Sequence, residues 1–132
     1  MGSGIIIKCN KCEFSKELLL GYGMYKPTFE KTMETIDERN INVVERLLEN
    51  YCVEDFHVTR QIYYCEECSE IVDKSALKID FQDGVKFEEQ MYCNKCNNKM
   101  AKINNLKEID NIHCPNCREA ALTYIENYIS WD

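Results

Sequence analysis

The sequence from residue 93 to residue 117 reads CNKCNNKMAKINNLKEIDNIHCPNC. A Cys-x-x-Cys pair opens this stretch and another closes it, with 17 residues between Cys96 and Cys114. Each pair can place two sulfur atoms on one metal ion within a tight turn, and a tetrahedral site needs two such turns. Because the spacing is typical of zinc ribbons, the stretch predicts a four-cysteine zinc site.

The same pattern occurs twice more toward the N-terminus. Of the nine cysteines in this chain of 132 residues, eight form four pairs: Cys9/Cys12, Cys65/Cys68, Cys93/Cys96 and Cys114/Cys117. An odd count of cysteines argues against a complete disulfide framework. The sequence shows no secretory signal and no stretch of about 20 apolar residues that would span a membrane. We therefore expect a cytoplasmic protein with no membrane contact, in which the eight paired thiols hold two structural zinc ions.

Two arrangements of the four pairs are compatible with the sequence. We favour sequential pairing, in which the first pair joins the second and the third joins the fourth. In the alternative, the second pair joins the third across the tight-turn signal Asp83-Gly84, and the first joins the fourth. The alternative would tie the two ends of the chain together, and the sequence leaves both arrangements open.

The residues around the cysteine pairs predict mainly β-structure. Short apolar or alternating runs predict strands at 5–8, 16–20, 62–64, 77–81 and 121–131. Between the first two pairs, Pro27 suits the first turn of one helix, and the spacing of Val44, Leu47, Leu48 and Tyr51 predicts a second. Asn42 with Glu45 could cap that second helix.

We call each Cys-x-x-Cys turn a knuckle. These elements predict an α+β fold built from two zinc-ribbon units with rubredoxin-like knuckles. The first unit would span residues 1–73 and carry a two-helix insertion at about 27–52. The second would span residues 74–132 and be rich in β-strands. A single compact unit is the alternative to these two domains.

The residues after the knuckles favour zinc over iron. Rubredoxin-type knuckles usually carry glycine directly after the second cysteine, and this chain has Glu13, Ser69, Asn97 and Arg118 there. Four thiolates leave no open coordination position, so we expect structural and not catalytic sites. His57 and His113 lie outside any ligand pattern and are not expected to bind the metal.

The remaining features favour a protein that binds another protein and is not an enzyme. No catalytic constellation is visible, and the formal net charge of −7 would repel phosphate backbones. A nucleic-acid-associated zinc ribbon is therefore a weaker alternative. A redox-sensing or enzymatic protein that uses Cys52 is a third, although we expect Cys52 to be a small buried side chain.

A glycine-bounded loop is the candidate interface with a partner. Tyr22, Met24 and Tyr25 lie between the second expected strand and the first helix, and tyrosine and methionine are enriched at interface cores.

The N-terminal segment resembles uncharacterised zinc-ribbon proteins of Gram-positive bacteria. The resemblance rests on residues 4–12, GIIIKCNKC, and on residues 19–23, LLGYG, and extends through the later knuckles to Trp131-Asp132. It implies a zinc-ribbon fold and no particular activity. The many Ile, Lys and Asn residues suggest a bacterial or phage origin.

Overall fold

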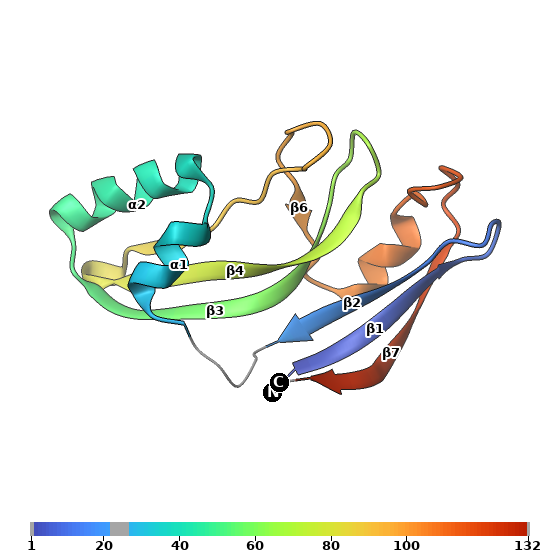
Figure 1. Cartoon of the computed structure of the whole chain (residues 1–132), viewed down its shortest axis with the longest axis horizontal. Helices are drawn as coiled ribbons and strands as arrows, with labels where there is room; N and C mark the ends of the chain where they lie inside the picture. Colours follow the sequence, from blue (N-terminus) through green and yellow to red (C-terminus); the bar gives the residue numbers. More distant parts are fainter. Residues whose placement is uncertain (1, 22–26, 132) are drawn as a thin grey trace.

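The computed structural model describes residues 2–21 and 27–131, with side chains to residue 126. In this part of the chain, a seven-stranded antiparallel sheet is accompanied by two α-helices and two short 3₁₀ segments, an α+β fold as expected (Figure 1). The elements in chain order are β1 (Gly2–Cys9), β2 (Ser15–Gly21), α1 (Phe29–Thr35), α2 (Glu38–Asn50), β3 (Val53–Tyr64), β4 (Ile71–Phe81), η1 (Gln82–Gly84), β5 (Lys86–Glu88), β6 (Ala101–Lys102), η2 (Leu106–Asn111) and β7 (Leu122–Trp131).

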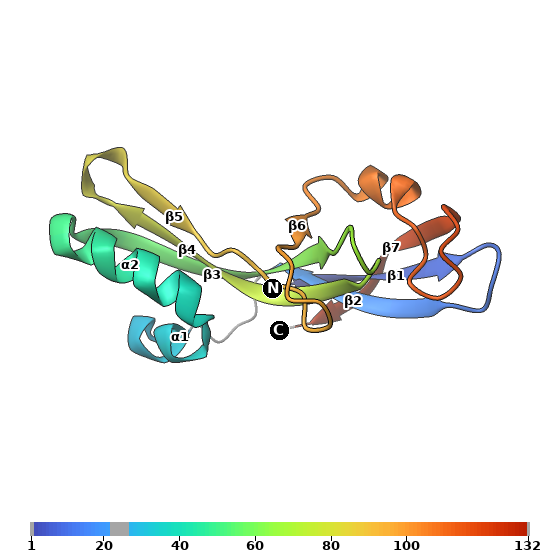
Figure 2. The same cartoon turned by 90° about the horizontal axis from the view of Figure 1, so that it is seen from above.

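The sheet has the strand order β5-β4-β3-β2-β1-β7, and β6 pairs separately with β3. The last strand of the chain thus lies beside the first, and Leu122 of β7 is the register partner of Cys9. Figure 2 shows β1, β2 and β7 at one end of an elongated molecule, with α1 and α2 beside β3 and β4 at the other. The expected division between residues 73 and 74 falls inside β4.

The two parts of the sheet meet at a short junction. β2 and β3 share a single register pair, Gly21 with Arg60. Beside this pair, the Asp73 carboxylate accepts hydrogen bonds from the backbone N–H of Leu19 and from the Arg60 guanidinium, the latter at 2.7 Å. Leu19 is the register partner of Gly4 in β1, and on its other side the Asp73 carboxylate takes the place of a β3 carbonyl as the acceptor for its N–H.

Three groups of buried side chains form the core. The first lies among β1, β2, η2 and β7, and the second lies between α2 and the β4 residues Leu77, Ile79 and Phe81. The third surrounds Tyr63 and Met91. The first and third clusters include buried cysteines, whereas the helical cluster contains none among its described members.

The helices lie between β2 and β3, within the segment expected to hold them. The expected cap of the second helix at Asn42 with Glu45 is wrong, because α2 begins at Glu38, five residues before the start that this cap would give. Asp37 has extended backbone angles and accepts the N–H of Arg39 at 2.9 Å, so it is the N-cap.

The tight turn expected at Asp83-Gly84 is confirmed and connects β4 to β5. Asp83 and Gly84 have φ angles of 64° and 76°, the left-handed conformation that such turns require. Neither α1 nor α2 is long and apolar enough to cross a membrane.

Candidate metal centres

Eight thiols come together in two groups, and each group could hold a metal ion such as zinc. We call them site 1 and site 2. Within each site the sulfur atoms all lie within 4.8 Å of one another. Site 1 consists of Cys9, Cys12, Cys114 and Cys117, and site 2 consists of Cys65, Cys68, Cys93 and Cys96.

The favoured sequential pairing is therefore wrong, and the alternative arrangement is the one observed. The reason is strand pairing. The first knuckle lies in the turn between β1 and β2, and β7 pairs with β1 and so brings the fourth knuckle to the same end of the sheet. The second knuckle lies in the turn between β3 and β4, and the chain after β5 returns along this hairpin with the third knuckle.

The distances between sulfur atoms fit metal ligands. In site 1, Cys9 lies 3.5 Å from Cys117 and Cys12 lies 3.6 Å from Cys114. In site 2, the separations from Cys65 to Cys96 and from Cys68 to Cys93 are 3.4 and 3.3 Å. Four sulfurs at a Zn–S distance of about 2.3 Å on a tetrahedron lie roughly 3.8 Å apart. A disulfide would need about 2.05 Å, so the donor set suits a tetrahedral metal ion.

In three of the four knuckles, the residue directly after the second cysteine has a left-handed backbone conformation. Ser69, Asn97 and Arg118 have φ angles of 61°, 63° and 66°. The N–H of each donates to the carbonyl of the first cysteine of its knuckle, at 2.9 to 3.0 Å. These positions correspond to the usual glycine of a rubredoxin-type knuckle, so the turn forms without the residue that favours it. Glu13, the corresponding residue of the first knuckle, is not among the described residues with positive φ.

Arg118→Gly is expected to stabilise the metal-loaded protein by about 1 kcal/mol, because glycine adopts positive φ without the steric cost of a Cβ atom. Asn97→Gly should gain less, because asparagine tolerates this conformation better than arginine. The measurement is chemical denaturation at fixed free zinc. Glu13→Gly is the matched control and should not stabilise, and a gain there equal to that of Arg118→Gly would contradict the explanation.

Hydrogen bonds to sulfur support the thiolate form of Cys12 in site 1, whereas desolvation and the neighbouring thiols raise the pKa of the Cys117 thiol. The backbone N–H of Lys11 lies 3.3 Å from the Cys9 sulfur, and the Asn116 side-chain amide reaches across to Cys12 at 3.5 Å. The Asn116 amide and then the Phe14 N–H lower the pKa of the Cys12 thiol to about 6. Asn116 was not identified from the sequence as a hydrogen-bond donor to a thiol. Its position inside a knuckle was the only feature of the sequence that could have indicated this role. Such donors stabilise the charge that a metal ligand carries.

Asn116→Ala is expected to weaken metal binding at site 1 by about tenfold. Protons compete with metal for thiolates, and without the amide Cys12 takes up its proton at a higher pH. Metal should therefore leave site 1 at a higher pH than in the unmodified protein. A chromogenic chelator followed during acid titration measures this. Asn10→Ala in the facing knuckle should leave the titration unchanged, and equal shifts for both variants would refute the role of Asn116.

The four sulfurs of each site are unequally buried. Cys9, Cys65, Cys93 and Cys114 are buried, whereas Cys96 is exposed. Four thiolates fill the four positions of a tetrahedral metal ion. A metal bound by all four thiols of either site would therefore have no open coordination position for substrate.

The remaining candidate residues lie apart from both sites. Cys52 is exposed and not buried as expected, because it falls in the link after the end of α2 at Asn50 and not on the helix face. His57 on β3 lies 3.3 Å from Asp55, and neither it nor His113 belongs to the two ligand groups found among the described residues. The candidate interface residues Tyr22, Met24 and Tyr25 lie outside the described residues.

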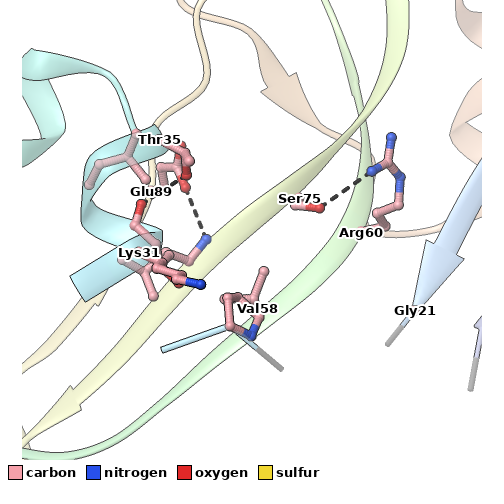
Figure 3. A pocket seen from close by; sticks show the side chains of 11 residues that line it. Gly21, Lys31, Thr35, Val58, Arg60, Ser75 and Glu89 are labelled. Atoms are coloured by element: carbon pink, nitrogen blue, oxygen red, sulfur yellow. Dashed lines mark hydrogen bonds between the residues drawn. The ribbon is translucent and has the colours of Figure 1, made fainter. Parts of the chain in front are cut away.

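A cavity of about 390 Å³ lies between α1 and the strands β3 and β4 (Figure 3). Thr32 and Glu89 are the buried polar residues that line it, and the Glu89 carboxylate accepts the Leu77 N–H at 3.0 Å. Burial raises the pKa of the Glu89 carboxyl group. The hydroxyl of Thr35 donates to a helix carbonyl, and Arg60 is paired with Asp73. None of the described residues that line the cavity is a cysteine or a histidine.

Comparison of the chain with protein-family models, with curated proteins and with solved structures gives no match. The resemblance to Gram-positive zinc-ribbon proteins therefore stays a prediction.

Proposed function

We propose that this chain is a non-enzymatic binding protein in which two structural zinc ions fix the sheet and function lies in contacts with another protein. The observation that carries the proposal is that each cysteine cluster supplies four thiols. Four thiolates saturate a tetrahedral zinc ion, whereas catalytic zinc sites keep one position for water or substrate.

We further propose that each site and its hairpin form a zinc-ribbon-like unit. The hairpin of β1 and β2 would be closed by the fourth knuckle, and the hairpin of β3 and β4 by the third. Zinc is favoured over iron because it is the usual ion of structural four-cysteine sites that join two Cys-x-x-Cys turns.

A protein partner fits the charge of the chain. The formal net charge is −7 before the eight thiols lose their protons, and metal binding requires that loss. A chain of this charge is repelled by phosphate backbones, so we favour a protein over a nucleic acid as the partner.

Cobalt substitution tests the closed sites. Co²⁺ loaded in place of zinc should give the absorption spectrum of tetrahedral cobalt with four thiolates, in two equivalents per chain. Adding azide or cyanide at millimolar concentration should leave this spectrum unchanged. A shift of the bands would reveal an exchangeable ligand, and the structural assignment would then fail.

Substitution in the glycine-bounded loop tests the site of contact. Tyr22→Ala combined with Tyr25→Ala should keep both metal ions and the melting temperature while partner capture by chemical cross-linking is lost. Tyr124→Ala, on β7 beside the first core cluster, is the contrasting variant and should lower the melting temperature. If the loop variant melts as early as Tyr124→Ala, the loop residues are core and the contact surface lies elsewhere.

A further inference from the structure

The N-terminus of α2 is attached to the third knuckle through Arg39. The Arg39 guanidinium carbon lies 3.3 Å from the centroid of the Tyr92 ring, directly before Cys93. The same guanidinium donates to the Asn97 side chain at 3.1 Å, directly after Cys96. Two further hydrogen bonds of 2.8 Å hold it to the N-cap Asp37. Arg39 thus touches both residues that flank the Cys93–Cys96 turn.

The next residue of α2 makes a second attachment. Asn40 is buried, with 4% of its surface exposed. Its side-chain amide donates to the carbonyl of Gln90 at 2.8 Å, and its oxygen accepts the N–H of Gln90 at 2.9 Å. The Gln90 side chain in turn donates to the carbonyls of Met91 and Met100, on both sides of the knuckle. A buried amide that loses such partners is left with an unsatisfied donor and acceptor, so this pairing depends on the position of the chain before the knuckle.

These attachments are specific to one of the two sites. Among the residues that the structure describes, no hydrogen bond or ion pair of α1 or α2 reaches a ligand of site 1 or a residue that flanks the knuckles of site 1. The apolar face of α2 packs on β4 through Val44, in a cluster whose described members include no cysteine. The helices are therefore held in two ways, by an apolar contact that needs no metal and by polar contacts to a segment that carries two ligands of site 2.

We propose that the metal at site 2 controls the attachment of the first turn of α2, whereas the metal at site 1 does not. With metal bound, Cys93 and Cys96 fix the turn, and Tyr92 and Asn97 stay in place for Arg39. Without it, the turn loses its fixed conformation, and the Arg39 and Asn40 contacts are lost together. The Val44 contact keeps the helix on the sheet, so the response is local opening at the start of α2. The proposal rests on metal binding by site 2, as proposed above.

Amide hydrogen exchange on two matched variants tests the coupling. Cys65→Ser removes a buried ligand of site 2 and leaves the third knuckle intact, and Cys9→Ser removes a buried ligand of site 1. Peptides that cover the start of α2 should exchange at least about tenfold faster in Cys65→Ser than in Cys9→Ser. Metal content is measured on the same samples. A single ion in both the unmodified protein and Cys65→Ser would refute metal binding at site 2, whereas one ion lost in Cys65→Ser with unchanged exchange in α2 would refute the coupling alone.

The reverse experiment does not depend on the folding of a cysteine variant. Coupling is reciprocal, so loss of the helix contacts must weaken metal binding at site 2. Arg39→Ala should weaken the affinity for one of the two ions by about five- to tenfold in equilibrium competition with a chelator and leave the other affinity unchanged. Arg46→Ala, in the same helix, is the matched control. Equal affinities for Arg39→Ala and the unmodified protein would overturn the proposal.

Discussion

Removal of both metal ions is expected to unfold most of the chain. Structural zinc contributes about 10–16 kcal/mol per site in zinc-finger peptides, whereas a whole domain is stable by about 5–15 kcal/mol. Loss of two such ions would exceed the stability that the rest of the fold supplies. Incubation with a strong chelator should therefore abolish the cooperative thermal transition. Circular dichroism and elemental analysis of the same sample measure the outcome.

The distribution of buried cysteines explains why the effect should be large. Cys9 and Cys114 belong to the core cluster of β1, β2 and β7, and Cys65 and Cys93 belong to the cluster around Tyr63. Without metal, neighbouring thiols in these clusters would have to keep their close packing with no shared ion. The helical cluster lacks cysteines among its described members and should retain the most structure.

Restoring zinc after removal of the chelator is the control, and the transition should return. Magnesium should not restore it, because thiolates bind soft or borderline metals and not hard cations. A chain that keeps its transition with no metal bound would contradict a structural role for the two sites.

The ligands and the local elements could be predicted from the sequence, because the signals for both are local. Two cysteines separated by two residues identify a knuckle by themselves, and alternation identified the strand before Asp83-Gly84. The α+β class followed from these elements. The helix start was missed by five residues because Asp37 and Asn42 are both acceptable caps, and only the packed structure distinguishes them.

The pairing of the knuckles could not be predicted, because it depends on which strands become neighbours. Sequential pairing follows from proximity along the chain, but the pairing of β1 with β7 brings residues from the two ends together. The local sequence of Leu122–Trp131 does not predict that this strand pairs with β1. The contact of Asn116 with Cys12 depends on the same long-range pairing and could not be found for the same reason.

Substitution of one ligand is expected to release only the three thiols that share its site. In Cys93→Ser, one ion should be lost, and Cys65, Cys68 and Cys96 should become reactive toward a thiol-alkylating reagent. The four thiols of site 1 should stay protected by their metal. Cys114→Ser should give the complementary result, with site 2 protected. We expect the alkylation rate of released thiols to rise by at least about tenfold, since a thiolate bound to metal is a poor nucleophile compared with a free one.

Mass mapping of the alkylated cysteines distinguishes the observed arrangement from sequential pairing in a single variant. Sequential pairing would expose Cys114 and Cys117 in Cys93→Ser and protect Cys65 and Cys68, the opposite of the result expected here. Cys52 is exposed and belongs to neither site, so it should react at the same rate in every variant and serves as the internal reference. Alkylation of all eight remaining cysteines would mean that the variant has unfolded, and Cys96→Ser, which removes the exposed ligand of site 2, then replaces it. Protection of Cys65 and Cys68 in a folded Cys93→Ser would refute the arrangement, because in this fold those two thiols have no other metal to share.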